Sequence, residues 1–171
     1  EELNMKHILS FLLLMSFSLI VKSQEKDIIE WKTVQQADSL QLKGDKRLIL
    51  MDVYAEWCGP CKLMDKHTFQ NKEVAQYINE NFIPVKFNAE SKEDVTFKGK
   101  TYQWVSNGRT GLQAFAYFIL GGQVRYPSMP IIDTNGRPIT SITGYYQAEE
   151  FLSTIKDVKG KVDEFLANEQ Q

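Results

Sequence analysis

The chain has 171 residues, with 20 Lys and Arg side chains against 22 Asp and Glu, and its formal net charge is −2. This nearly balanced composition offers no basic stripe, and it excludes nucleic acid as an expected partner. The length suits one domain with a sizeable core, because a chain of about 150 residues buries roughly 70% of its unfolded surface.

The first residues have the features of an export signal. Met5-Lys6-His7 supplies the charged start, residues 8–21 are largely apolar, and Val21-Lys22-Ser23 has the form of a cleavage site. The apolar stretch is shorter than the roughly 20 residues that a membrane span needs. We therefore expect a signal peptide at residues 1–23, with translation starting at Met5, and a single domain at 24–171. An uncleaved N-terminal anchor is the alternative.

The first half of the domain alternates strand and helix patterns. Residues 48–54 form a dense apolar run with one acid in it, which is typical of a strand buried on both faces. A helix is expected to start at Cys58 and to break near Thr68-Phe69, and Asn71 can cap the next helix. The remaining predicted elements here are a short strand at 31–33, a helix at 37–44 and a strand at 83–88.

A long segment, about residues 89–128, separates this half from the next strand. It is expected to hold a polar loop at 89–94, a hairpin at 95–105 that turns at Lys98-Gly99-Lys100, and a helix at 110–120. Its aromatic residues have two interpretations, a lid or partner surface beside the functional site, or ordinary core packing. They are Tyr102, Trp104, Tyr117, Phe118 and Tyr126.

The C-terminal part predicts a hairpin and a final helix. Strands at 130–133 and 139–143 flank Asn135-Gly136, which is a strong hairpin-turn signal. From Ala148 to Phe165, apolar residues recur at helical spacing. The predicted fold is therefore α/β, a mixed sheet flanked by helices.

Cys58 and Cys61 are the only cysteines, and they stand two residues apart where the buried strand gives way to a helix. A C-x-x-C pair at such a junction is a redox arrangement. The helix N-terminus stabilises a thiolate on the first cysteine, which we expect to be exposed, and the second can resolve a mixed disulfide. Pro60 suits an early helical position, because its missing N–H costs nothing there.

Two other interpretations of the cysteine pair are weaker. A zinc site needs about four ligands, and His67 is the only other soft ligand outside the leader. A purely structural disulfide would stabilise little, since the loop that it closes is so short. No metal and no cofactor beyond a redox-active disulfide is therefore expected.

Four stretches resemble landmarks of the thioredoxin superfamily, in the right order. They are residues 48–62 around the cysteines, Val85-Lys86-Phe87-Asn88, Met129-Pro130-Ile131 and Gly144. The resemblance covers roughly residues 30–160 and implies the thioredoxin fold, with an insertion at about 89–128 before the strand that carries the cis-proline.

The resemblance also implies roles for individual residues. Asp52 would lie beneath Cys61 and move its proton, with Lys86 as its charge partner; a carboxylate buried in such an apolar run is costly unless it is paired or protonated. Pro130 would be the cis-proline, and Met129 would pair its backbone with a substrate strand. The other expected substrate-binding residues are Trp57, Gly59, Pro60 and Gly144.

Residues 66–74 resemble the same stretch of exported thioredoxin-like proteins, including the periplasmic C-terminal domain of the reductant carrier DsbD. This implies a periplasmic, monomeric thiol-disulfide oxidoreductase that meets protein disulfides or dithiols and a membrane or periplasmic thiol donor. Gly59-Pro60 resembles reducing thioredoxins, which favours a reductase. The alternatives are a non-enzymatic partner-binding module and a client-specific reductase for cytochrome c maturation.

Overall fold

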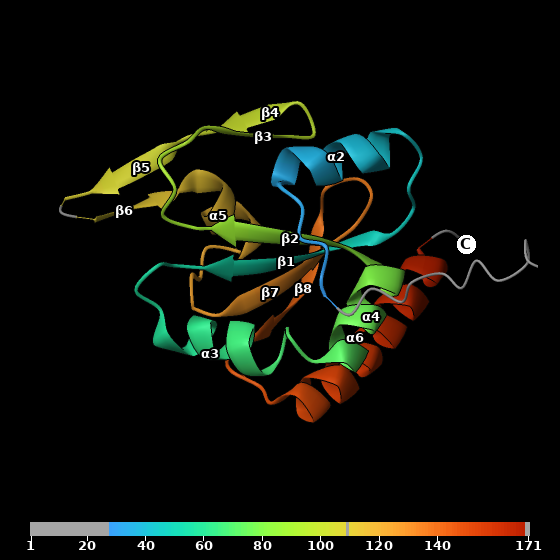
Figure 1. The fold of residues 1–171 in the computed structure, drawn as a ribbon. Helices are drawn as coiled ribbons and strands as arrows, with labels where there is room; N and C mark the ends of the chain where they lie inside the picture. The colour runs from blue at the N-terminus through green and yellow to red at the C-terminus, as the bar shows by residue number, and fades with distance from the viewer. Residues whose placement is uncertain (1–27, 109, 170–171) are drawn as a thin grey trace, which may run out of the picture.

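The computed structural model describes residues 28–108 and 110–169, so the predicted signal peptide lies outside the described residues. Figure 1 shows a central sheet with helices on both faces. The helices are α2 (Val34–Leu42), α3 (Gly59–His67), α4 (Lys72–Asn81), α5 (Ala114–Ile119) and α6 (Ala148–Asn168). The strands are β1 (Leu48–Tyr54), β2 (Phe82–Asn88), β3 (Val95–Phe97), β4 (Lys100–Tyr102), β5 (Trp104–Asn107), β6 (Thr110–Gln113), β7 (Ser128–Ile132) and β8 (Pro138–Thr143).

The central sheet has the strand order β2-β1-β7-β8. β1 runs parallel to β2 and antiparallel to β7, and β8 pairs antiparallel with β7. The prediction of a mixed sheet covered by helices is therefore confirmed.

The alternation of side chains along β1 divides the core into two clusters. Ile49, Met51 and Val53 belong to the cluster shared with α2 and α5. Leu48 and Leu50 belong to the cluster shared with α3, α4 and α6. Because successive side chains point to opposite faces, Asp52 shares the face of Leu48 and Leu50, which is the face that α3 covers (Figure 1).

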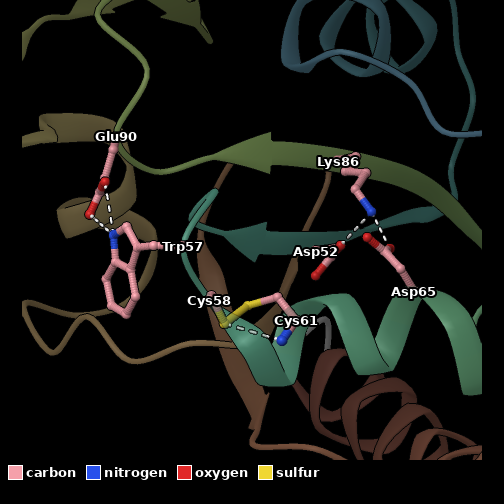
Figure 2. The surroundings of a disulfide bond; sticks show 7 residues. All are labelled: Asp52, Trp57, Cys58, Cys61, Asp65, Lys86 and Glu90. Carbon is pink, nitrogen blue, oxygen red and sulfur yellow. Dashed lines mark hydrogen bonds and ion pairs between the residues drawn. A yellow bond between two sulfur atoms is a disulfide. The ribbon is translucent and has the colours of Figure 1, made fainter.

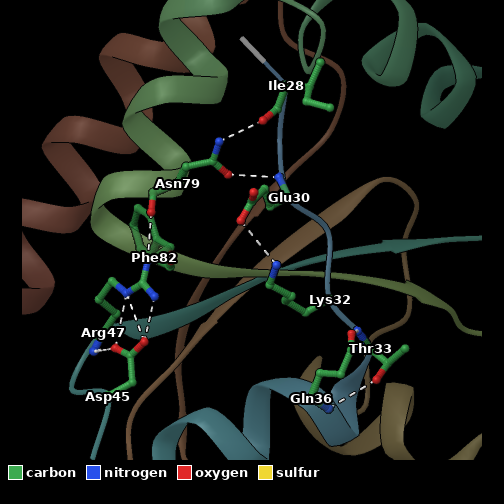
Figure 3. A network of polar contacts seen from close by, with 9 residues as sticks. All are labelled: Ile28, Glu30, Lys32, Thr33, Gln36, Asp45, Arg47, Asn79 and Phe82. Atoms are coloured by element: carbon green, nitrogen blue, oxygen red, sulfur yellow. Dashed lines mark hydrogen bonds and ion pairs between the residues drawn. The ribbon is translucent and has the colours of Figure 1, made fainter. Parts of the chain in front are cut away.

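Polar contacts fix the first described residues to the sheet and to α4 (Figure 3). The Asn79 side chain accepts a hydrogen bond from the Glu30 backbone N–H at 3.0 Å and donates one to the Ile28 carbonyl at 2.8 Å. Arg47 donates to the Asn79 carbonyl at 2.8 Å while it is ion-paired with Asp45. The segment predicted as a strand at 31–33 forms only a single bridge, from Lys32 to β2.

The long segment between β2 and β7 adds two hairpins and α5. The hairpin β3–β4 turns at Lys98 and Gly99, both with positive φ, as this two-residue turn requires. The helix predicted at 110–120 is shorter than expected, because residues 110–113 instead pair with β5 as strand β6. The Trp104 ring occupies the space where a Gly111 side chain would lie, within 1.8 Å of an added Cβ.

Most of the aromatic residues of this segment are packed, and some are not. Phe115 of α5 is fully buried, and its ring lies 5.2 to 5.4 Å from those of Phe87, Phe97 and Tyr102. Tyr117, by contrast, is 57% exposed. The hairpins and α5 are therefore part of the core around β2, with an exposed outer side.

Candidate active site

The cysteine pair lies at the start of α3, directly after β1 and its following turn (Figure 2). Cys58 is the N-cap residue, its sulfur accepts a hydrogen bond from the Cys61 N–H at 3.1 Å, and the two sulfurs form a disulfide. An N-cap sulfur faces the unpaired N–H groups of the first turn, which stabilise negative charge there. The arrangement can therefore hold a thiolate at Cys58 once the bond is reduced.

The structure corrects one expectation about the nucleophile. Cys58 is only 2% exposed and Cys61 only 4% exposed. Both pack in a small cluster with Ala55, against Tyr54 and Tyr126. This cluster thus receives one side chain from β1 and one from the segment before β7, and both cysteines are buried.

Asp52, Lys86 and Asp65 form an acid–lysine–acid group behind the disulfide (Figure 2). The parallel register places Asp52 opposite Lys86 on neighbouring strands, with 3.3 Å between Oδ2 and Nζ. Lys86 also makes an ion pair with Asp65 on α3. The Lys86 ammonium lies 5.4 Å from the centre of the Trp31 ring and 5.3 Å from that of Tyr54. The Lys86 ammonium therefore interacts with two carboxylates and two aromatic rings at once.

Burial controls the protonation of this group. Asp52 is 2% exposed, and within the described chain its Oδ1 has no hydrogen-bond partner. Burial raises the pKa of Asp52 to about 6, Lys86 opposes the rise and Asp65 adds to it. Burial lowers the pKa of Lys86, but the two carboxylates outweigh it, so that this pKa lies above its ordinary value. Asp52 can therefore accept and release a proton near neutral pH.

A pocket of about 250 Å³ opens beside this group and is lined by Cys61, Lys62, Asp65 and Lys86 among others. The side of the disulfide that carries the second cysteine thus shares one recess with the charged side chains of Lys62, Asp65 and Lys86. A proton that leaves Cys61 has polar groups close by to receive it.

Trp57 precedes the cysteine pair and is 68% exposed. Its indole N–H donates to both carboxylate oxygens of Glu90, at 3.0 and 3.1 Å (Figure 2). Its ring meets that of Tyr126 edge-to-face, with 5.7 Å between centroids. Burial, and then the charge of Glu90, raise the pKa of Tyr126 to about 12, so that its phenol stays neutral.

The cis peptide bond of the described chain is Tyr126–Pro127, so the prediction that Pro130 is the cis-proline was wrong. Pro130 lies inside β7, opposite Ser141 of β8. Met129 is fully buried among core side chains, and its side chain is therefore not at the surface. Gly144, with φ +106°, donates its N–H to the Pro127 carbonyl at 2.9 Å, which places it beside the cis bond.

Most of the site residues predicted from sequence lie around the disulfide, whereas Met129 and Pro130 lie inside β7. Cys58, Cys61, Asp52 and Lys86 come together, and Gly59 and Pro60 lie exposed at the helix start beside them. The structure adds Asp65, Glu90 and Tyr126 to the site. Of these three, sequence reasoning named only Tyr126, as one of the aromatic residues that form either a lid or partner surface or ordinary core packing. Asp65 carried a signal, since it stands one helical turn after Cys61 and so shares its helix face.

Within residues 28–108 and 110–169, no three His, Cys, Asp or Glu side chains are placed to hold a metal ion. In the same part of the chain, no helix combines the length and the apolar character that crossing a bilayer would require.

Comparison with known proteins places this geometry in a family. A family model described as a thioredoxin-like domain matches residues 34–159. The thiol:disulfide interchange protein DsbD of Tatumella citrea is 25% identical over 132 residues, which are 75% of this chain and 19% of that protein. DsbD of Actinobacillus pleuropneumoniae serotype 5b is 23% identical over 141 residues, which are 80% of this chain and 21% of that protein. The chain thus spans about a fifth of the length of these relatives.

Solved structures show the same fold. A DsbH oxidoreductase has a TM-score of 0.55 at 15% identity, covering 78% of this chain and 85% of that one. A candidate disulphide isomerase from Bacteroides thetaiotaomicron has a TM-score of 0.54 at 26% identity, covering 76% of this chain and 92% of that one.

Proposed function

Because this chain belongs to the thioredoxin-like domain family, we propose that it is a thiol-disulfide oxidoreductase that reduces protein disulfides through Cys58 and Cys61. The observation that carries this proposal is the cysteine pair at the N-terminus of α3, next to a buried carboxyl group whose pKa is raised to about 6. A static disulfide would have no use for such a proton acceptor.

The reaction starts from the reduced pair. The Cys58 thiolate attacks one sulfur of a substrate disulfide, the substrate S–S bond breaks, and the departing substrate sulfur takes a proton. Asp52 then takes the proton of the Cys61 thiol, and the Cys61 sulfur attacks that of Cys58. The second substrate sulfur leaves as a thiolate and takes a proton from the solvent, and the Cys58–Cys61 disulfide is left behind. Two electrons have passed from the protein to the substrate.

The reducing direction and the place of action are parts of the same proposal. Gly59-Pro60 between the cysteines favours reduction, and the apolar leader favours export to the periplasm. An external dithiol, in the membrane or the periplasm, would have to return the enzyme to its reduced form. The likeness to DsbD supports protein thiols and disulfides as partners.

Reduction of insulin tests the proposal, because reduced insulin chains precipitate and turbidity follows the rate. With dithiothreitol as the reductant, the protein should accelerate precipitation and Cys58→Ser should not. Cys61→Ser should instead retain a mixed disulfide with its substrate, since resolution is lost. No acceleration by the wild type, together with unchanged partner binding by Cys58→Ser, would contradict the proposal and support a non-enzymatic binding module.

A further inference from the structure

β8 is the last strand of the central sheet, and its outer edge has no strand beside it within residues 28–108 and 110–169. The order β2-β1-β7-β8 gives β8 one neighbour, β7. The outermost strand on the other side, β2, is instead bridged by Lys32. The unpaired edge of a strand presents backbone N–H and C=O groups to which a further strand can pair. The edge of β8 is therefore a place where the sheet can be extended.

The sequence of β8 lacks the side chains that commonly prevent such pairing. Edge strands are protected by charged residues, above all lysine, and by proline. β8 reads Pro-Ile-Thr-Ser-Ile-Thr, so it contains no charge, and its proline stands only at the first position. Isoleucine and threonine both favour extended strands. From Ile139 onward, β8 thus has the composition of a strand that can accept a neighbour.

On one face of the sheet, a mainly apolar groove of about 360 Å³ runs between β8 and α6. Two cations also border it, but each is already ion-paired, Arg137 with Asp133 and Lys161 with Asp157. An apolar side chain suits this groove better than a charged one. The residues of β8 and α6 that form its apolar lining are Pro138, Ile139, Val158, Val162 and Phe165.

On the opposite face, a polar recess of about 230 Å³ adjoins the same strand. It is lined by the side chains of Gln123, Arg125, Ser141 and Thr143, among others. Arg125 is exposed and has no acidic partner in the described part of the chain, where it makes a 3.4 Å hydrogen bond to the Gln123 side-chain oxygen. A cation without a counter-charge, surrounded by hydroxyl and amide groups, is complementary to a carboxylate.

The two recesses match the alternation of side chains along an added strand. Residues that pair across two strands point to the same face, and successive residues point to opposite faces. A side chain opposite Thr140, which lines the α6 groove, would enter that groove, and the next one, opposite Ser141, would enter the recess beside Arg125.

We propose that the edge of β8 binds an extended segment of a partner protein in which apolar and acidic side chains alternate. Its backbone adds a strand to the sheet, its apolar side chains lie along α6, and its carboxylates pair with Arg125. In this mode of recognition the backbone hydrogen bonds supply affinity, and the recesses for alternate side chains supply specificity. Cys58 and Cys61 line neither recess, so the inference stands independently of the proposed function.

The probe is a dye-labelled peptide about seven residues long in which valine and glutamate alternate. Fluorescence anisotropy should show that it binds the wild type, and that a valine–lysine peptide binds more weakly. Arg125→Glu should weaken binding of the glutamate peptide by about five- to tenfold and strengthen binding of the lysine peptide. Arg125→Lys keeps the charge and should bind as the wild type does.

The groove along α6 is tested by Phe165→Ala, which should weaken binding of the glutamate peptide by about fivefold or more, because apolar contact is lost. Val105→Ala is the matched control, since Val105 is also an exposed apolar residue, 58% against 46% for Phe165, but lies on the β5–β6 hairpin. It should leave the affinity unchanged. The exposed Arg125 variants keep the inference testable if Phe165→Ala does not fold.

Pairing through the backbone has a separate test. One peptide is methylated on the backbone nitrogen of its central residue, and a second on that of the next residue. Because successive N–H groups point to opposite edges of a strand, only one of the two peptides should lose its affinity. The unmodified peptide should also slow hydrogen exchange of the amides of residues 139–143.

Several results would overturn the inference. They are no binding of the glutamate peptide, equal binding of the glutamate and lysine peptides, full affinity of both methylated peptides, or unchanged hydrogen exchange in β8. Sedimentation velocity tests the remaining occupant, a second copy of this chain. A wild-type dimer that Thr140→Lys converts to a monomer would show that β8 pairs with its own copy, and it would contradict the partner segment.

Discussion

Asp52 is the residue on which the proposed chemistry depends most closely after the cysteines. It lies on the face of β1 that α3 covers, it is almost fully buried, and its one charged partner on the next strand is shared with Asp65. Its pKa rises to about 6 because the attraction of Lys86 does not fully offset the effect of burial. A carboxyl group with this pKa can exchange a proton with a thiol at neutral pH.

The same burial should make stability depend on pH. The pKa of Asp52 is 3.8 ordinarily and about 6 in the folded protein, so that the folded state binds more protons between these values. Stability should therefore fall as the pH rises from about 4 to about 6, by about 3 kcal/mol at 1.36 kcal/mol per unit of pKa. Asp52→Asn should lack this loss, and urea unfolding of the oxidised protein at pH 4 to 8 would measure it.

A matched control for that measurement is Asp163→Asn, which changes an exposed carboxylate on α6. Its stability curve should follow that of the wild type across the whole pH range, apart from a small constant offset. If the curves of Asp52→Asn and the wild type ran parallel from pH 4 to 8, the assignment of a raised pKa to Asp52 would be wrong.

Asp65 should tune this proton acceptor from α3. It raises the pKa of Asp52 by its charge, and it also holds Lys86, the cation that lowers that pKa. Asp65→Asn should therefore lower the pKa of Asp52, on the order of one unit. Carbon-13 NMR titration of the Asp52 carboxyl group measures the change directly. A pKa that rose or stayed constant would show that Asp65 does not act on Asp52 in this way.

The residues predicted from sequence were those with a local signal. Cys58 and Cys61 could be predicted from their spacing, and Asp52 from its position in an apolar run. The cis-proline was misassigned because Pro127 and Pro130 lie three residues apart, and the resemblance could be aligned to either. Glu90 was missed, and Tyr126 was named only as one of five aromatic residues of a lid, a partner surface or the core, because the contacts of both residues join segments that are distant in sequence.

At the scale of elements, α5 determines whether the long segment belongs to the core. Phe115 is fully buried against three aromatic rings, whereas Tyr117 on the same helix is 57% exposed. Phe115→Ala should lower the free energy of unfolding by about 3 to 5 kcal/mol, because it leaves a large cavity. Tyr117→Ala should change it by less than about 1 kcal/mol. Denaturant unfolding of the two variants provides a comparison within one helix.

Similar values for the two α5 variants would contradict the packing described here. The segment would then behave as a separate surface attachment, not as a part of the core around β2. A large effect of Tyr117→Ala alone would instead mean that the outer side of α5 is covered in solution.

The element predictions failed where pairing partners decide the structure. Residues 110–113 were expected to be helical because apolar side chains follow them at helical spacing. They form β6 because β5 pairs with them and the Trp104 ring needs the open face of Gly111. The helices with clear caps, α4 after Asn71 and α3 after Cys58, began where the sequence indicated.

The molecule as a whole combines a mixed sheet, two core clusters and a covered disulfide at one end of β1. The fold could be predicted because its landmarks follow one another in the order typical of the superfamily. The contacts of Trp57 with Glu90 and Tyr126 could not, since they join the turn before α3 to the segment after β2 and to the segment before β7. Export remains a prediction from residues 1–23, which lie outside the described part of the chain.

The redox potential of the Cys58–Cys61 couple tests the central claim most directly. It can be measured by equilibrating the protein with glutathione or dithiothreitol buffers and quantifying the disulfide. A reductase of this family should give a potential near that of thioredoxin, about −270 mV. A potential near about −120 mV, the value of a strong oxidant, would contradict the reducing assignment. If no dithiothreitol buffer reduced the Cys58–Cys61 disulfide, the proposal that the protein is a thiol-disulfide oxidoreductase would be contradicted.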